Sequence, residues 1–226
     1  MKNTLKLLGI VAVAVIIGFS VSSCGEPGSK VDPAANRISY VSGIHELVIE
    51  KDPNRSAFSP LAGDSYKLLA NNIPISWGKL SSIVGSLFTF TPAVDATGAL
   101  PFTATKGTVG GSEGLSITGN TVTPVGGVAV TISPMTWGPA GNWKGNVTFH
   151  DNTTLEVNLE VKGTSVNGTW ELDTGDSGTY TAEGNTFVVV DSGVVSANAK
   201  LINNNTIEVK FTSNSYFKGT STFTRQ

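Results

Sequence analysis

The 226-residue chain has little of what most metal and redox sites require. It contains one cysteine, Cys24, and two histidines, His45 and His150. A single cysteine forms no disulfide within the chain, and one thiol with two imidazoles falls short of the four ligands of a structural zinc site. We therefore expect no bound metal and no cofactor.

Charge is scarce as well. Only 14% of the residues are charged, and the formal net charge is −2, whereas charged residues make up about 25% of an average soluble domain. The 15 lysines and arginines are scattered along the chain rather than clustered. Because nucleic-acid binding needs a basic surface that neutralises phosphates, the sequence predicts a protein that binds no nucleic acid.

The N-terminal leader is the most specific feature that is present. Lys2 and Lys6 open the chain, and an apolar run without charge extends from Leu7 to Phe19. As a helix this run covers only ~20 Å, which is short of the ~30 Å hydrocarbon core of a bilayer. A basic start followed by a short apolar run is typical of a secretory signal peptide.

Small residues follow the apolar run in the order Val21, Ser22, Ser23 and lead to Cys24. This stretch resembles the lipobox of bacterial lipoproteins, and the whole leader is similar to those of spirochaete lipoproteins. The resemblance implies that residues 1–23 are removed as a signal peptide and that Cys24 carries the acyl chains, palmitate among them. Several acyl chains anchor a protein stably, whereas one binds only marginally. The alternative for Cys24 is a free structural or catalytic thiol.

The resemblance also implies a location and a partner. The protein would reside in the bacterial cell envelope, in the outer membrane or on its periplasmic face, with the membrane bound through Cys24. Residues 24–36 are rich in Gly, Pro, Ser and Ala, which suits a flexible tether between the anchor and a folded domain.

Residues 37–136 predict a β-rich domain of unknown topology. Plausible strands rich in β-branched and aromatic residues lie at Ile38–Ile49, Ile83–Thr91, Phe102–Thr105, Leu115–Ile117 and Val128–Ile132. Asp64–Asn71 and Lys79–Leu87 are the best helical candidates, but both are shorter than the ~12 residues of a stable helix. Trp137–Gly141, with Pro139 and two glycines, marks a domain boundary.

Residues 141–226 show a clearer strand pattern. Runs of strand residues recur at Asn142–His150, Thr154–Lys162, Val166–Leu172, Gly178–Ala182, Thr186–Val190, Ser196–Ile202, Thr206–Thr212 and Phe217–Thr224. In several runs apolar and polar residues alternate, so that one face is buried and the other solvated. The Asn167-Gly168 pair fits a tight turn or lies within a strand. The pattern predicts an antiparallel up-and-down meander of about eight strands, which closes into a barrel or remains an open sheet or sandwich.

Two features of this region resemble lipocalins. Gly141-Asn142-Trp143 matches the G-x-W motif at the start of that family's first strand, and Arg225 lies where the family places a basic residue over the tryptophan. The resemblance implies a small eight-stranded barrel. Its inward-facing candidates are aromatic and predict a filled interior: Trp143, Phe149, Trp170, Phe211, Phe217 and Phe223.

Four catalytic motifs occur without the partners or the context that their chemistry needs. Asp173-Thr174-Gly175 reads as an aspartic-protease motif and overlaps Gly175-Asp176-Ser177-Gly178, the trypsin-like serine motif. The first needs a second aspartate and the second needs a histidine with a buried aspartate. Both stretches also have the composition of a hairpin loop.

The other two motifs lack their context. Gly110-Gly111-Ser112-Glu113-Gly114 matches G-x-S-x-G, but no hydrophobic strand precedes it and no helix follows, so a glycine-rich hairpin is expected. His45-Glu46 starts an H-E-x-x-H pattern that has Ile49 in place of the second histidine. We therefore expect no catalytic residue and no enzymatic activity.

Four tryptophans remain as candidates for binding. Trp143 and Trp170 lie on alternating apolar faces and are expected in the core, whereas Trp77 and Trp137 lie near Pro and Gly in predicted loops and are candidate surface contacts. The resulting hypothesis is a lipid-anchored envelope protein that acts as a non-catalytic binding or scaffold module. One alternative is a carrier of a small apolar ligand, and a second is an envelope hydrolase or protease inhibitor. The sequence leaves open whether the partner is a protein, a glycan or a small apolar molecule.

Overall fold

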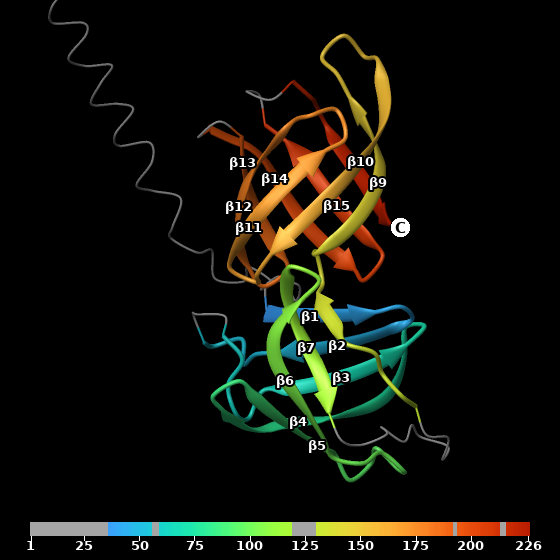
Figure 1. The fold of residues 1–226 in the computed structure, drawn as a ribbon, viewed down its shortest axis with the longest axis vertical. Helices are drawn as coiled ribbons and strands as arrows, with labels where there is room; N and C mark the ends of the chain where they lie inside the picture. The colour runs from blue at the N-terminus through green and yellow to red at the C-terminus, as the bar shows by residue number, and fades with distance from the viewer. Residues whose placement is uncertain (1–35, 56–58, 119–129, 192–193, 213–215) are drawn as a thin grey trace, which may run out of the picture. The chain divides into compact units, whose positions relative to one another are not determined.

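The computed structural model describes residues 36–226 except 56–58, 119–129, 192–193 and 213–215. Every regular element in the described residues is a β-strand, and the strands form two closed antiparallel barrels of eight strands each (Figure 1). Both barrels follow meander order, in which each strand pairs with the next and the last pairs with the first. The all-β fold predicted from the sequence is thus confirmed.

The first barrel is built from eight strands: β1 (Arg37–Ser42), β2 (His45–Glu50), β3 (Ser65–Ala70), β4 (Ile73–Val84), β5 (Leu87–Pro92), β6 (Phe102–Val109), β7 (Ser112–Thr118) and β8 (Met135–Trp137). The short strand β8 closes it by pairing with two neighbours. Tyr40 of β1 lies opposite Trp137, and Leu115 of β7 lies opposite Met135.

Several strand boundaries predicted from the sequence are wrong in this barrel. The predicted strand Ile38–Ile49 is a hairpin, because Gly43 adopts a φ of 55° that favours glycine and turns the chain between β1 and β2. Ile83–Thr91 is likewise split between β4 and β5. The two helical candidates, Asp64–Asn71 and Lys79–Leu87, belong to β3, β4 and β5 because pairing with neighbouring strands outweighs their weak helical pattern. Of the predicted strand Val128–Ile132, residues 128 and 129 lie outside the described residues, and residues 130–132 belong to none of the eight strands.

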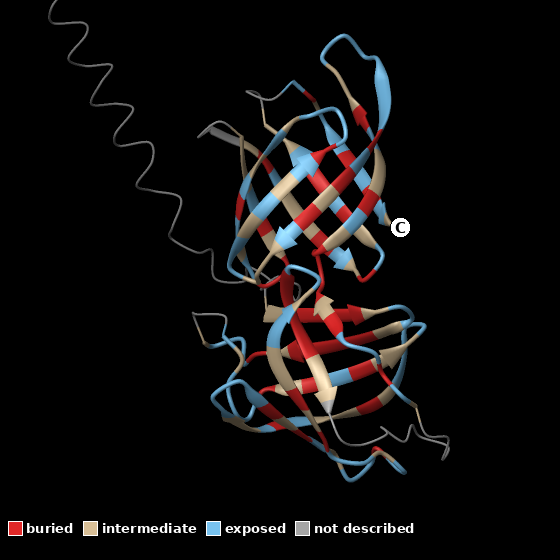
Figure 2. Cartoon of the chain, viewed as in Figure 1, coloured by how far each residue is buried: buried red, intermediate tan, exposed pale blue. Residues whose placement is uncertain are grey.

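Aromatic rings fill the interior of the first barrel. Phe90 and Phe102 stack with ring centroids 4.6 Å apart, and Tyr66 meets both rings edge-on at 5.1 and 5.6 Å. Phe88 adds a further edge contact with Phe90. Aliphatic side chains from β1, β2 and β3 complete this core, and Figure 2 shows the alternation of buried and exposed residues along the strands.

The second barrel is built from the last eight strands: β9 (Gly141–Thr148), β10 (Thr154–Gly163), β11 (Asn167–Leu172), β12 (Ser177–Glu183), β13 (Thr186–Asp191), β14 (Val194–Asn203), β15 (Thr206–Phe211) and β16 (Thr220–Arg225). Pairing of β16 with β9, from Phe223 opposite Gly145 to Arg225 opposite Trp143, closes it. The eight strands predicted for this region and their antiparallel order are confirmed. Asn167-Gly168 lies within β11 rather than in a turn.

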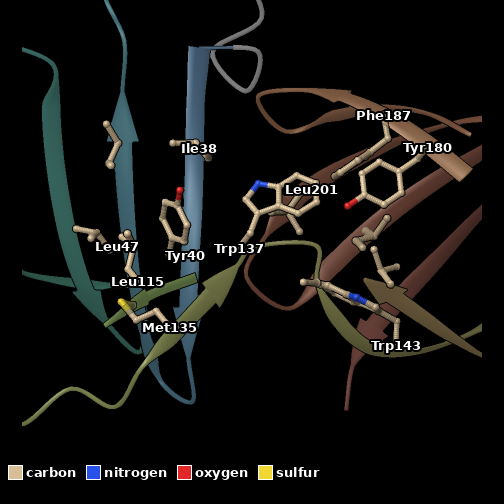
Figure 3. Packing of buried hydrophobic residues seen from close by; sticks show 14 of the residues in the cluster. Ile38, Tyr40, Leu47, Leu115, Met135, Trp137, Trp143, Tyr180, Phe187 and Leu201 are labelled. Carbon is tan, nitrogen blue, oxygen red and sulfur yellow. The ribbon is translucent and has the colours of Figure 1, made fainter. Parts of the chain in front are cut away.

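The two barrels belong to one compact unit and touch where β8 passes into β9. Trp137, the last residue of β8, stacks on Tyr180 of the second barrel at 5.7 Å and meets Phe187 edge-on at 5.6 Å (Figure 3). Arg225 donates hydrogen bonds to the carbonyl oxygens of Gly138 and Ala140 in the same connection. The buried hydrophobic residues of both barrels therefore form one continuous cluster.

Candidate functional site

The second barrel contains a cavity of about 80 Å³ that opens to the surface. Almost all of its wall is apolar and comes from the inward faces of β10 to β16. Leu159 and Val161 of β10 and Ile207 and Val209 of β15 are part of this wall. An apolar cavity with few polar groups is the usual form of a site for a small hydrophobic molecule.

Small residues on β14 explain why space remains. Ala197 and Ala199 point inward at positions where a larger side chain would reach into the barrel. On β12, Gly178 lets Trp170 lie flat against the strand, because a Cβ there would stand 2.9 Å from the indole Nε1 and 2.1 Å from the Val190 carbonyl oxygen. The same indole donates a hydrogen bond of 3.3 Å to Val190 O, which fixes the ring in the wall.

The end of the cavity next to the first barrel is closed by aromatic packing. Tyr180 and Phe187 line the cavity and contact each other edge-on at 5.8 Å, and Trp137 covers them from the first barrel. Burial and the nearby negative charge of Glu113 raise the pKa of Tyr180, so its phenol stays neutral. Its hydroxyl donates to Thr164 O at 3.1 Å.

The opposite end of the cavity carries its polar groups. Asp176 precedes β12, Asp191 ends β13, and Ser196 lies near the start of β14, so all three belong to the end of the barrel where β11, β13 and β15 finish. Thr174 Oγ1 donates a hydrogen bond of 3.0 Å to Asp176 Oδ2. Tyr216, which is 72% exposed, also lines this end.

The interior aromatic residues lie partly as expected. Trp143, Phe217 and Phe223 are buried, and Phe149, Trp170 and Phe211 are partly buried and pack against the core. They do not fill the barrel completely, because Trp170, Phe211, Phe217 and Phe223 also line the cavity. Phe211 and Phe217 instead pack together with centroids 5.2 Å apart.

Arg225 lies over Trp143, as the sequence resemblance implies. Its Cζ is 4.1 Å from the centre of the Trp143 ring, a cation–π distance. Burial lowers the pKa of Arg225 to about 10, while the negative charge of Glu46 acts in the opposite direction. The guanidinium also donates to Asn204 O at 2.6 Å. Arg225 and Trp143 are cross-strand partners where β16 pairs with β9, so their contact lies where these two strands close the barrel.

The two tryptophans predicted to form a contact surface lie in strands, not loops. Trp137 is completely buried, so the expected surface position is wrong, and the reason is its packing between the barrels. Trp77 of β4 is partly exposed and donates a hydrogen bond of 3.0 Å to Asp95 Oδ1. A contact role for Trp77 stays a prediction.

Residues of the catalytic motifs have structural partners. Asp173 accepts hydrogen bonds from the backbone and side-chain nitrogens of Asn158, at 3.1 and 2.6 Å, and so fixes the loop before β12. Gly110 and Gly111 form the turn of the predicted hairpin, with φ values of 57° and 83°. His45 starts β2, and partial burial lowers its pKa.

A buried carboxylate between the barrels was not predicted from the sequence. Glu113 of β7, read from the sequence only as part of a glycine-rich hairpin, accepts a hydrogen bond of 2.6 Å from the Tyr40 hydroxyl. Ser165 of the second barrel donates to the same oxygen at 3.2 Å, and Lys106 Nζ stands 3.1 Å from the other. Burial is the main cause that raises the pKa of Tyr40, and the charge of Glu113 adds to it.

The described ranges contain no cluster of three or more histidine, cysteine and acidic side chains able to hold a metal. They also contain no helix with the length and apolarity of a membrane span. Cys24, the predicted site of lipid attachment, lies outside the described residues. Comparison with protein-family models, with curated proteins and with solved structures finds no match to this chain.

Proposed function

We propose that the protein is a lipid-anchored envelope protein whose second barrel binds a small apolar ligand. One observation carries the binding proposal: the core of the second barrel contains an apolar cavity that opens to the surface. This is a specific form of the binding-module hypothesis, because the ligand would be held inside the barrel rather than on its outer surface.

The size and polarity of the cavity favour an apolar occupant over water. A buried water molecule needs two to four polar partners, and an apolar cavity of about 150 Å³ in another protein stays dry and binds benzene. The cavity here, at about 80 Å³, is smaller but open at one end. A short alkyl chain or a single ring would therefore fill the enclosed part, and the rest of the ligand would occupy the open end.

The lipocalin-like resemblance supports the same function by analogy. Eight strands in meander order and the Arg225–Trp143 contact agree with it. A barrel of this size holds either packed side chains or one small ligand. Fold alone does not specify function, whereas the cavity and its apolar lining are features of this chain itself.

Titration with straight-chain alcohols tests the proposal. From 1-propanol upward, each methylene that enters the cavity contributes about 0.8 kcal/mol, so affinity should rise about fourfold per carbon and then level off once the space is full. Isothermal titration calorimetry measures this slope.

Two matched variants locate the binding. Ala197→Leu fills the cavity and should abolish alcohol binding, whereas Ala104→Leu places the same change in the packed interior of the first barrel and should leave binding intact in the folded fraction. The proposal is wrong if no alcohol binds, or if both variants bind as the unmodified protein does.

The anchor is tested separately. In bacteria that express the full chain and are fed labelled palmitate, the mature protein should carry the label and remain with membranes. Cys24→Ala should remove both properties. An unlabelled, fully soluble product from the unmodified chain would contradict the anchor and leave the cavity proposal standing.

A further inference from the structure

We infer that the open end of the second barrel docks on a lipid surface, which would be the source of the apolar ligand. This inference rests on the proposed binding function and the proposed anchor, and it adds the partner that the mouth of the cavity contacts. It comes from the apolar side chains around that mouth, at the end of the barrel opposite the Trp137 contact.

Apolar side chains continue from the cavity onto the surface at this end. Leu155 of β10 is 42% exposed, although it points to the same side of the strand as the buried Val157. Tyr216 lines the cavity and is 72% exposed. Exposed apolar groups that adjoin one another commonly mark an interaction surface, because leaving them in water is unfavourable.

Ring contacts connect these two positions. Phe149 and Phe217 form an isolated β-bridge, and their ring centroids are 5.1 Å apart. Leu155 points to the same side of the β9–β10 hairpin as Phe149, since its cross-strand partner Val147 precedes Phe149 by two residues. Tyr216 is the chain neighbour of Phe217. We call Phe149, Leu155, Tyr216 and Phe217 the rim of the cavity.

The β9–β10 hairpin places part of the rim at the tip of the barrel. Residues 154–158 of β10 pair with β9 alone, because the pairing of β10 with β11 extends only over residues 159–163. The hairpin therefore projects beyond the neighbouring strands (Figure 1). Phe149 and Leu155 would be among the first side chains to meet a surface that approaches this end.

The rim fits an uncharged apolar surface. Ionised side chains of both signs lie around this end, Asp151, Asp176, Asp191 and Lys218 among them, so no single sign of charge dominates the attraction. Tyrosine combines an apolar ring with a polar hydroxyl and is enriched where membranes meet water. Interfacial binding of this kind grows with the apolar area that enters the lipid.

The proposed anchor favours a bilayer over a second protein as the partner. Residues 24–36, between the anchored Cys24 and β1, span at most about 45 Å when extended. The longest strands of the second barrel have 10 residues and are about 33 Å long. The open end is therefore within reach of the membrane that holds the anchor. Because the tether raises the local concentration of lipid, weak docking suffices.

Vesicle binding by the mature chain without acyl chains tests the docking. Residues 33–226 form one compact unit, so residues 24–226, produced in the cytoplasm without the signal peptide, retain both barrels. We expect this protein to co-sediment with neutral phosphatidylcholine vesicles at millimolar lipid. Added salt should not release it, because apolar contacts are not weakened by screening.

Two matched double variants assign the contact to the rim. Leu155→Ser with Tyr216→Ser removes the two most exposed rim side chains and should weaken vesicle binding about tenfold or more. Ile44→Ser with Ile73→Ser removes side chains that are 51% and 66% exposed on the first barrel and should leave vesicle binding unchanged. The docking inference is wrong if the unmodified protein binds no vesicles, or if the two double variants bind equally well.

Alcohol binding separates this inference from the function on which it rests. If the unmodified protein binds alcohols but no vesicles, the docking is wrong and the proposed function stands. If it binds vesicles through the rim but no alcohol, the rim is a docking surface and the cavity proposal is wrong.

Discussion

The two barrels have the same number of strands in the same order, yet their interiors differ. In the first barrel Tyr66, Phe90 and Phe102 are in mutual ring contact at the centre. In the second barrel the corresponding space is bordered by Ala197 and Ala199 and remains an open cavity. Strand number and closure therefore do not determine whether the interior of a barrel is filled by side chains or contains a ligand-sized cavity.

The size of the inward-facing side chains determines whether a cavity remains inside the barrel. An eight-stranded barrel is just wide enough for its side chains to fill it, so a few small residues on one strand suffice to open a cavity. The comparison assigns a stabilising role to the first barrel and a binding role to the second.

Truncating an aromatic ring should cost far more in the first barrel than in the second. Phe90→Ala removes a fully buried ring that contacts three others and should lower the free energy of unfolding by about 3–5 kcal/mol. Phe211→Ala removes a partly buried ring from the wall of an existing cavity and should cost less than half as much. Urea unfolding of both variants measures the difference, and equal losses would argue against unequal packing.

Glu113 should matter because it joins the barrels. Glu113→Ala leaves the buried Tyr40 hydroxyl without its acceptor and removes the partner of Ser165 and Lys106, so we expect a loss of about 2–3 kcal/mol in the free energy of unfolding. Glu113→Gln keeps an oxygen acceptor and should cost less. As a control, Glu156→Ala removes an exposed ion pair with Lys144 and should change stability by less than about 0.5 kcal/mol.

The same alanine-to-leucine change should have unequal effects in the two interiors. Ala104→Leu overpacks the first barrel and should destabilise it by about 1–3 kcal/mol. Ala197→Leu fills existing space and should leave stability unchanged or raise it slightly. Thermal and urea unfolding provide the measurement. A destabilisation by Ala197→Leu as large as that by Ala104→Leu would mean that the second barrel has no usable space.

Alkaline pH should weaken the fold through its buried tyrosines. Burial raises the pKa of both Tyr40 and Tyr66, whereas an unfolded tyrosine titrates near pH 10. Their contribution is therefore complete below pH 10 and is lost as pH rises above it, at up to about 1.4 kcal/mol per pH unit for each group. Urea unfolding between pH 9 and 11 should show this slope. It should be smaller in Tyr66→Phe and unchanged in Tyr216→Phe, whose ring is 72% exposed.

The sequence predicted the second barrel better than the first for a physical reason. Alternation such as that of Ile207, Glu208 and Val209 reports directly on a sheet with one buried face, and short polar turns separate the runs. In the first barrel, β1 and β2 read as one run because only Gly43 marks the turn, and β8 has three residues and no recognisable pattern. Local sequence is a weak guide to strands that depend on their neighbours.

The candidate site could be predicted only in part. Apolar inward residues and the Arg225–Trp143 contact follow from pattern and resemblance. The cavity does not, because it depends on side chains that are distant in sequence, such as Trp170 of β11 and Ala197 of β14 with its cross-strand partner Phe211. Trp137 was misplaced for the same reason, since its burial comes from Tyr180 and Phe187, which are distant in sequence.

A crystal structure of the protein soaked with a brominated short-chain alcohol tests the central claim most directly. The bromine's anomalous signal should lie inside the second barrel, among Val161, Ala197 and Phe211, and it should be missing from crystals of Ala197→Leu. Bromine bound only on the outer surface, around an interior filled by side chains, would contradict the claim that the first barrel is packed and the second binds a ligand inside.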